Sequence, residues 1–294
     1  LDNLIKKGYD VTVYSTFDQI FFGELKWKKL NKNLFEKQLA KKISKENIIF
    51  VPRTSINLLL SILAKRFVAK FSIFCQISED YFFTNTGIKM YRGKHFSRQA
   101  DQMTEGLSAL HDSKPITFIK YDKPDLDDYV LISCNGTEQI KMLNTTQWVE
   151  LCRTIPKEMH IVLVGVEKDL AFNGKLLKLI KPLGLKVHDF TCKTNLFQLF
   201  GLVKYANYII SIDSGPAHVA EHFNKDVIIF YGPTDSENIS KFANRTKVIH
   251  YKNKCPLNIS PCYKQIEDQK CPANKECLYK IDVVNELRIF QDKL

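Results

Sequence analysis

The sequence lacks the patterns that mark several large protein classes. No apolar run approaches the roughly 18 residues that a membrane-spanning helix needs. The Gly-x-Gly-x-x-Gly dinucleotide fingerprint, the Walker phosphate loop, the His-Glu-x-x-His zinc motif and the Cys-x-x-Cys pair are all absent. These absences argue against a membrane-spanning protein, a dinucleotide-dependent dehydrogenase, a P-loop NTPase and a common zinc protein. Internal repeats and low-complexity segments are absent as well.

What the chain does contain is typical of a globular protein, since 45% of its 294 residues are apolar. It begins with Leu1 instead of Met, and residues 1–8 are typical of the end of a helix, so we expect an upstream segment. We expect no signal peptide. Cysteines 75, 134, 152 and 192 are scattered through apolar or strand-like stretches. Such cysteines are typical of reduced thiols and predict a cytoplasmic location.

The net charge of +11 is unevenly distributed. Residues 1–124 carry 21 Lys and Arg against 12 Asp and Glu, a net +9, whereas residues 125–294 carry 22 against 20, a net +2. A basic first half favours an anionic partner: nucleic acid, phosphorylated glycolipid or the anionic face of a membrane. A lysine-rich solvated surface explains the same excess without any partner. The candidate contacts to an anionic partner in this half are Arg53, Lys94, His95 and Arg98.

Strand-like apolar runs alternate with helix-like stretches along the chain. This alternation predicts an α/β protein with two Rossmann-like domains in tandem, each with a parallel sheet flanked by helices. Residues 111–128 are polar, contain two prolines and form the expected linker, so we place the domains at 1–120 and 121–294. Strands are expected at 10–15, 47–51, 69–76, 129–133, 160–164, 186–189, 208–212 and 227–231. Helices are expected at 34–43, 56–70, 96–110, 147–154, 174–182, 196–205, 217–223 and 283–292, and residues 81–94 are expected to be irregular.

Residues 207–235 hold the most informative pattern: a strand, a loop, a helix and a second strand. The first buried run stops at Asp213, Ser214 suits a helix N-cap, Gly215 permits close backbone approach and Pro216 suits the first turn. A helix that starts at the carboxyl end of a parallel strand presents unpaired N–H groups and commonly binds phosphate. A capped helix in a Rossmann-like core is the simpler interpretation.

Three blocks of the second half resemble those of a known family. The strongest is Asp-Ser-Gly-Pro-Ala-His at 213–218, followed at the expected distance by Tyr-Gly-Pro-Thr-Asp at 231–235. The others are Gly136-Thr137 with Lys141 and Trp148 behind it, and Lys-Thr-Asn-Leu at 193–196. Together they resemble the lipopolysaccharide heptosyltransferases, glycosyltransferase family nine, well over residues 129–294 and more weakly over 1–110. The resemblance implies the two-domain GT-B fold and a nucleotide diphosphate sugar as donor substrate.

The resemblance assigns catalytic roles to Asp213, His218 and Lys141. Asp213 would hold the donor sugar, His218 would donate to the sugar or to phosphate, and Lys141 would neutralise the departing diphosphate. Without the resemblance, Asp213 is a turn or capping aspartate, His218 a packed histidine and Lys141 a surface lysine. The family's acid that acts as base belongs to a loop expected before Leu1, so no residue here is assigned as the base.

The positions of the three blocks in the chain also imply the remaining contacts to the donor. The helix start would bind the diphosphate, an acid after the strand 160–164 would accept from a ribose hydroxyl, and one loop would flank the base. For the ribose, Asp169 competes with Glu167, and Leu196 accompanies Thr194 beside the base. The donor-binding set is Gly136, Thr137, Lys141, Glu167, Thr194, Asp213, Ser214, Gly215 and His218.

Two histidines, the turn at 234–235 and the C-terminal cysteines each allow more than one interpretation. His218 and His222 lie four apart on one helical face, but no third ligand is evident, so we expect neither a metal nor any other cofactor. Thr234 and Asp235 either touch the donor or shape their loop, and we favour shape. For Cys255, Cys262, Cys271 and Cys277, a structural metal, a disulfide and free thiols are all open, with free thiols favoured.

The sequence therefore predicts a metal-independent, inverting glycosyltransferase. It would move a heptose or related sugar from a nucleotide diphosphate, with ADP-heptose expected, to a lipopolysaccharide core acceptor. Its partners would be the nucleotide sugar and a phosphorylated glycolipid, with peripheral association at the cytoplasmic face of the inner membrane and no nucleic acid. The alternatives are another GT-B nucleotide-sugar enzyme such as an epimerase, or a non-catalytic sugar-nucleotide or glycan-binding protein.

Overall fold

The computed structural model describes short strands in the first part of the chain and most of the second part. The described residues are 12–15, 26–29, 48–51, 72–76, 81–84, 87–90, 121–136, 138–234, 236, 246–251, 254–262 and 270–294. The chain divides into two compact units, Leu1–Lys120 and Tyr121–Leu294. The domain assignment, with the roles given to the two domains, stays a prediction. The helices expected before residue 121, together with Arg53, Lys94, His95 and Arg98, lie outside the described residues.

In the first unit, strands pair both in parallel and antiparallel. β1 (Thr12–Ser15) pairs in parallel with β2 (Lys26–Lys29), and β3 (Ile48–Val51) with β4 (Ser72–Gln76). β5 (Tyr81–Thr84) and β6 (Gly87–Met90) then extend the second sheet antiparallel. The expectation of irregular structure over 81–94 was therefore wrong for Tyr81–Thr84 and Gly87–Met90, because the aromatic run Tyr-Phe-Phe-Thr favours a strand.

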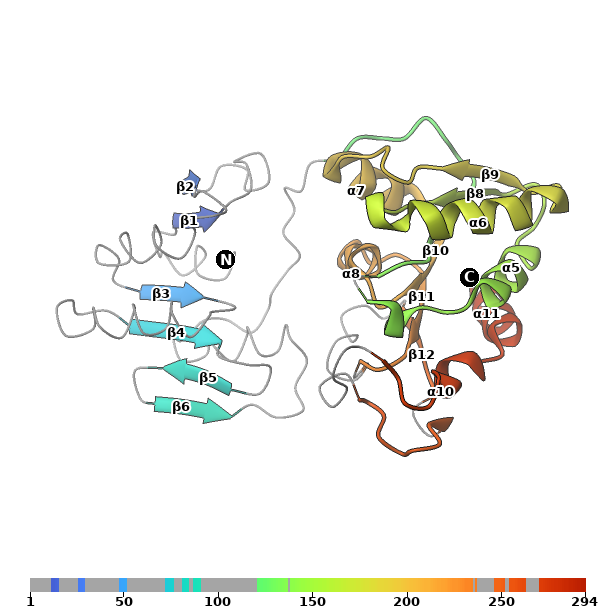
Figure 1. Cartoon of the computed structure of the whole chain (residues 1–294). Coiled ribbons are helices and arrows are strands. Elements are labelled where there is room, and N and C mark those ends of the chain that lie inside the picture. Colours follow the sequence, from blue (N-terminus) through green and yellow to red (C-terminus); the bar gives the residue numbers. More distant parts are fainter. Residues whose placement is uncertain are drawn as a thin grey trace. The chain divides into compact units, whose positions relative to one another are not determined.

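The second unit is built on a parallel six-stranded sheet in the order β12-β11-β10-β7-β8-β9 (Figure 1). Three of its strands are completely buried runs rich in β-branched residues, as expected for a sheet covered on both faces. The predicted α/β class with parallel sheet is confirmed. The strands are β7 (Tyr129–Ser133), β8 (His160–Leu163), β9 (Lys186–Asp189), β10 (Tyr208–Ile212), β11 (Val227–Tyr231) and β12 (Thr246–His250).

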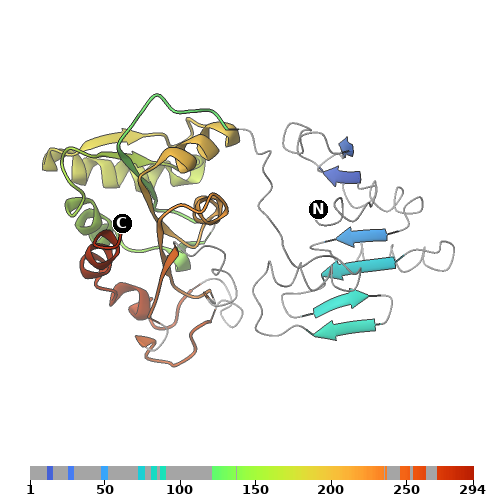
Figure 2. The ribbon, with the colours of Figure 1, turned by 180° about the vertical axis from the view of Figure 1, so that it is seen from behind.

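Helices cover both faces of this sheet (Figures 1 and 2). α5 (Thr145–Arg153), α6 (Leu170–Ile180) and α11 (Val283–Gln291) pack on one face around Trp148, Leu176 and Phe290. α7 (Leu196–Tyr205) and α8 (Gly215–His222) pack on the other, around Leu202 and Ala217. The shorter elements are η4 (Gln139–Lys141), η5 (Glu167–Asp169), η6 (Lys181–Leu183) and α10 (Glu276–Tyr279). No helix among the described residues is long and apolar enough to cross a bilayer.

Local signals explain where the helices begin. α5 and α7 start with complete capping boxes: Asn144 with Gln147, and Asn195 with Gln198. In α5 the Asn144 side-chain oxygen accepts from the Gln147 N–H at 2.8 Å, which fixes the helix start at Thr145. β12 and α10 were not predicted, since one is a partly polar edge strand and the other a single turn.

The strand order fixes where a ligand can bind. From β7 the chain winds outward through β8 and β9, then returns to place β10 on the other side of β7. In such sheets the crevice lies beyond the carboxyl ends of the two strands where the order reverses. Here β7 ends at Ser133, which pairs with Ser211, one residue before the end of β10 at Ile212. The sequence that follows each strand must therefore contribute to the crevice.

The segment entering the second unit is fixed against α7 and α8. The Tyr121 ring contacts Tyr205 and Phe223 edge-on, with centroid distances of 6.0 and 5.8 Å. The Asp122 N–H donates to the Phe197 carbonyl at 3.1 Å. The backbone of Asp122 can lie this close to α7 only because residue 201 is glycine. A Cβ at Gly201 would lie only 1.7 Å from the Asp122 carbonyl oxygen.

Gly201→Ala should therefore destabilise the second unit, by roughly 1–3 kcal/mol of unfolding free energy, since backbone must move to admit a methyl group. Gly174→Ala in α6 is the matched control, because a Cβ there meets nothing within 4 Å. That change should stabilise by about 0.5–1 kcal/mol through helix propensity. Urea unfolding of the full chain measures both, and equal effects of the two substitutions would contradict the role given to Gly201.

Candidate functional site

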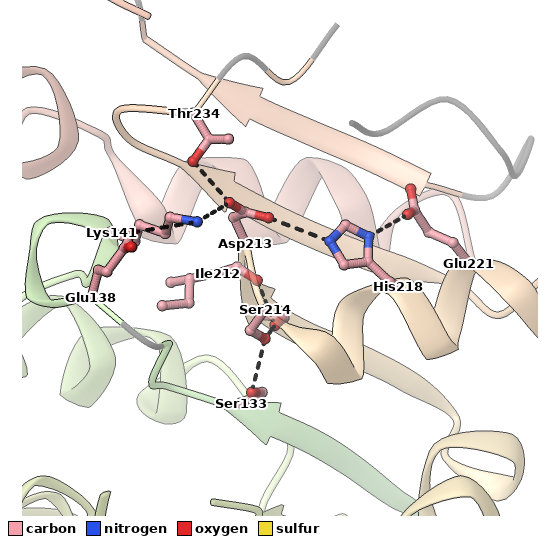
Figure 3. Close-up of polar contacts among 10 residues, drawn as sticks. Ser133, Glu138, Lys141, Ile212, Asp213, Ser214, His218, Glu221 and Thr234 are labelled. Atoms are coloured by element: carbon pink, nitrogen blue, oxygen red, sulfur yellow. Dashed lines mark hydrogen bonds and ion pairs between the residues drawn. The ribbon is translucent and has the colours of Figure 1, made fainter. Parts of the chain in front are cut away.

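The candidate site is centred on the carboxylate of Asp213, which directly follows β10 and is only 7% exposed (Figure 3). Its Oδ2 accepts from Lys141 Nζ and from Thr234 Oγ1, both at 2.8 Å. Its Oδ1 lies 3.4 Å from His218 Nε2. These partners come from η4, from the turn after β11 and from the first turns of α8. Three segments far apart in sequence thus meet at one buried charge.

His218 lies between two carboxylates. Its Nε2 faces Asp213, and its Nδ1 lies 3.2 Å from Oε2 of Glu221, one helical turn along α8 (Figure 3). The His218 side chain is 42% exposed, whereas that of Glu221 is 1% exposed. The imidazole therefore contacts Asp213 through one ring nitrogen and Glu221 through the other, and part of the ring is exposed to solvent.

These contacts shift the pKa values of Asp213 and His218 in opposite directions. Burial is the largest single influence on Asp213 and raises its pKa, but the hydrogen bonds from His218, Lys141 and Thr234 and the lysine charge together lower it to about 2. Burial also lowers the pKa of His218, yet the bonds and charges of Asp213 and Glu221 outweigh this and raise it to about 9. Asp213 is thus an anion and His218 a cation at neutral pH.

Lys141 is held in place by the short helix that carries it. Ile140 is buried beneath η4, and Lys275 Nζ donates to the carbonyls of Gln139 and Met142, both at 3.2 Å. Besides Asp213, the Lys141 ammonium faces Glu138 Oε2 at 3.8 Å. Two cations and three carboxylates, counting Glu138 and Glu221, therefore form the charged cluster. An incoming anion must exchange with contacts that already exist within the protein.

The start of α8 is open next to this cluster. A Cβ built on Gly215 would meet nothing within 4 Å, and Pro216 has no N–H group to donate. Ser214 occupies the N-cap position, but its side chain makes no capping bond. Its Oγ instead bonds Ser211 Oγ at 2.9 Å and Ser133 Oγ at 3.1 Å, which links β10 to β7 across the crevice. The Ser214 side chain, expected to cap the helix, instead connects the ends of β7 and β10. It accepts no hydrogen bond from the N–H groups at the start of α8.

Loops after β7, β8 and β9 line the crevice on its other side. Lys168 Nζ donates to the Gly136 carbonyl at 2.7 Å, and the Cys192 N–H donates to the Gly165 carbonyl at 2.9 Å. Glu167 is exposed in η5, whereas the competing Asp169 is buried and accepts from the Val166 N–H at 2.8 Å. The structure therefore leaves Glu167, not Asp169, accessible for a ligand. Thr194 is half-buried just before α7.

The structure brings Lys141, Asp213 and His218 into direct contact, and Ser214 and Gly215 follow Asp213 at the same strand end. Gly136 borders them, since a Cβ there would lie 3.5 Å from the Asp213 carbonyl oxygen. Glu167 and Thr194 belong to neighbouring loops without a contact to Asp213 among the described interactions. Thr137, Asp235 and the His222 side chain lie outside the described residues. The roles given to all these residues stay predictions.

Sequence reasoning did not predict Glu221, Glu138 or the contact of Thr234 with Asp213. Glu221 was detectable, since residues three apart in the expected helix 217–223 share a face with His218. Glu138 precedes Lys141 by the same spacing within a helical turn that was not predicted. The contact of Thr234 with Asp213 depends on how the turn after β11 folds, which no local pattern reports.

The cysteine-rich tail holds that turn. The Cys262 N–H donates to the Pro233 carbonyl at 2.9 Å, and His250 bonds Ser236 at 3.0 Å and Ser260 at 3.2 Å. Cys255, Cys262, Cys271 and Cys277 are free thiols, with Cys262 buried and the others half-buried. Among the described residues no three His, Cys, Asp or Glu groups gather as ligands of one metal ion. The expectation of a metal-free site stays a prediction.

Comparison with known proteins places these features in context. The model of glycosyltransferase family 9 (heptosyltransferase) matches residues 84–268. A lipooligosaccharide heptosyltransferase 2 from Campylobacter jejuni subsp. jejuni serotype O:6 is 21% identical over 140 residues, which are 44% of this chain and 44% of that protein. The match thus spans less than half the length of that relative.

Two solved structures share the fold over most of the chain. A family 9 glycosyltransferase from Veillonella parvula DSM 2008 has a TM-score of 0.63 at 14% identity, covering 92% of this chain and 82% of that one. The Escherichia coli heptosyltransferase WaaC with ADP has a TM-score of 0.60 at 15% identity, covering 94% and 86%. At these identities the likeness shows the fold alone.

Because its contacts lower the pKa of Asp213, the free energy of unfolding should decrease as the pH falls into the acid range. Because its folded-state pKa of about 2 lies below the ordinary 3.8, it contributes about 2 kcal/mol above pH 5 that is lost as pH falls through 4 towards 2. The difference in unfolding free energy between wild type and Asp213→Asn should therefore shrink between pH 6 and pH 3. Urea unfolding followed by the indole resonance of Trp148 measures it. Glu150→Gln, at an exposed position of α5, is the control, and a difference for Asp213→Asn that stays constant from pH 6 to pH 3 would contradict the compensated site.

Proposed function

The chain belongs to glycosyltransferase family 9, the heptosyltransferase family, and from this premise we propose that it is an inverting glycosyltransferase of lipopolysaccharide core assembly. It would move a heptose or related sugar from a nucleotide diphosphate donor, ADP-heptose, to a lipopolysaccharide core acceptor. The observation that carries the proposal is the cluster of Lys141, Asp213 and His218 at the point where the strand order reverses. A nucleotide binds there in folds of this kind.

The donor diphosphate is proposed to bind between Lys141 and the start of α8. Without a metal, the charge that develops on the departing nucleotide must be stabilised by cations and N–H groups. Lys141, protonated His218 and the backbone N–H of Gly215, next to which a Cβ would meet nothing within 4 Å, are proposed as these groups beside Asp213. Lys141 would move its ammonium from the Asp213 carboxylate to a phosphate oxygen, which exchanges one ion pair for another.

The sugar is proposed to replace those lost contacts on Asp213. A buried carboxylate must be compensated, and sugar hydroxyls donating to Oδ1 and Oδ2 would do so once Lys141 has turned to phosphate. Thr234 would keep donating to Oδ2 and hold the carboxylate in position. In this scheme Asp213 recognises the donor only when its sugar is present.

The nucleoside is proposed to extend along the ends of β8 and β9. Val166 and Leu196 are apolar side chains that are 58% and 41% exposed there, suitable walls for a base. Glu167 would accept from a ribose hydroxyl, and Thr194 would lie beside the base. The acceptor is proposed to be a phosphorylated glycolipid drawn by the basic first half, at the cytoplasmic face of a membrane. The base that activates its hydroxyl is assigned to no residue of this chain.

Titration calorimetry of the full chain with ADP-heptose, ADP-glucose, UDP-glucose and GDP-mannose tests the donor class. ADP-heptose should bind most tightly, and inorganic phosphate should bind far more weakly. Equal affinity for phosphate and for every nucleotide sugar would refute the transferase. Conversion of the donor without acceptor would indicate an epimerase, and binding without transfer to core lipid would indicate a binding protein.

Lys141→Met tests the diphosphate contact while keeping most of the side-chain volume. Loss of a charged hydrogen bond should weaken ADP binding roughly 10- to 100-fold. Lys175→Met, on the exposed face of α6, is the matched control and should leave the affinity unchanged. Equal affinities for ADP in the two variants would remove Lys141 from the diphosphate site.

Asp213→Asn separates recognition of the sugar from recognition of the diphosphate. Removing a negative charge beside the phosphates should leave ADP binding as tight as in wild type or tighter. The preference for ADP-heptose over ADP should disappear, and transfer should slow on the order of 100-fold. Calorimetry with both ligands and a transfer assay measure these effects. An equal loss of affinity for ADP and ADP-heptose would mean that Asp213 only supports the fold.

A further inference from the structure

We infer that Glu221 is a positioning residue, whose buried carboxylate keeps the His218 ring cationic and turns its Nε2 edge towards Asp213 and the open side of the site. The inference rests on the proposed function, because a fixed imidazolium matters where a diphosphate departs. It adds a residue that neither the sequence motif nor the family assignment singles out. Figure 3 shows the imidazole between the two acids.

The geometry of α8 sets up the contact. Glu221 follows His218 by three residues, so both side chains share one face of the helix. Glu221 Oε2 lies 3.2 Å from Nδ1, closer than the 3.4 Å between Asp213 Oδ1 and Nε2. The Glu221 side chain is 1% exposed and that of His218 is 42% exposed. A buried anchor therefore holds an accessible ring by one of its two nitrogens.

The two carboxylates determine the protonation state of the ring. A neutral imidazole has one N–H and one lone pair, so one of its nitrogens would face a carboxylate with no proton between them. Only the imidazolium donates to both acids at once. The charged groups that face the ring among the described residues are Asp213 and Glu221, with Lys141 acting on it through Asp213. The contact with Glu221 is thus independent of the carboxylate that the donor sugar would occupy.

This independence gives Glu221 its role. When sugar hydroxyls take over Asp213, the longer Nε2 contact can yield and the Nε2–H can turn to a phosphate oxygen. Glu221 keeps the Nδ1–H bond throughout, so His218 retains both its charge and its direction. Without Glu221, the ring would lose a proton as soon as Asp213 engaged the sugar at mildly alkaline pH. A merely structural glutamate would instead affect stability at all pH values alike.

Glu221→Gln tests the inference, since the amide oxygen can still accept the Nδ1–H bond but carries no charge. In the full chain the His218 ring, assigned by its absence from His218→Asn spectra, should titrate near pH 9 in wild type. Its pKa should fall by about one pH unit or more in Glu221→Gln. ADP affinity should then match wild type at pH 6 and be roughly 3-fold weaker at pH 8.5 for a fall of one pH unit, with a larger loss for a larger fall.

Glu286→Gln is the matched control, because Glu286 is a partly buried acid paired with Lys247 in another part of the unit. It should change neither the His218 pKa nor the pH profile of ADP binding, and Glu221→Asp should restore part of the lost pKa. An unchanged His218 pKa in Glu221→Gln overturns the inference, as does an ADP defect of equal size at every pH. If wild type binds no nucleotide, the proposed function fails, whereas the His218 titration still decides whether Glu221 controls the ring.

Discussion

A buried negative charge at the end of β10 is the constraint on which this site depends. An uncompensated carboxylate at 7% exposure would be costly, so the fold must bring donors to Asp213 from wherever the chain can supply them. Lys141 comes from the turn after β7, Thr234 from the turn after β11 and His218 from α8. The same donors are those that a nucleotide sugar needs. The resting contacts therefore hold the binding groups in place before any ligand arrives, which lowers the cost of ordering them on binding.

The sheet makes this convergence possible. Because all six strands are parallel, every loop after a strand emerges at the same edge, and the return from β9 to β10 opens a crevice beside β7. The serine contacts between Ser133, Ser211 and Ser214 close the strand ends below the crevice. Helices pack on both faces of the sheet and fix its strands. The packing of the core therefore determines the geometry of the charged cluster together with the loops.

Much of this arrangement was readable from sequence, because buried parallel strands are continuous apolar runs with sharp ends. β7, β9, β10, β11 and α7 have the predicted bounds, and the junction at Asp213 follows from one of them. The partners of Asp213 were harder to predict. Lys141 was found only through its register in a family motif. The contact of Thr234 with Asp213 was not predicted, because the pairing of β10 with β11 brings together two residues that are 21 apart in sequence. The hairpin β5–β6 was not predicted, since Tyr-Phe-Phe-Thr shows no alternation of apolar and polar residues.

The helices that carry the site also carry the entry to the second unit. α7 begins beside Thr194 and ends at Tyr205, whereas α8 begins beside Asp213 and has Phe223 as its C-cap. The two ends of each helix are about 12–15 Å apart. Tyr121 packs against both far ends, and its neighbour Asp122 is bonded to α7 across Gly201. The same two helices therefore carry site residues at their starts and the contacts of Tyr121 at their far ends. The close approach at Gly201 requires a residue without a side chain at that point of α7, so this crossing constrains the sequence of α7 as the charged cluster constrains that of α8.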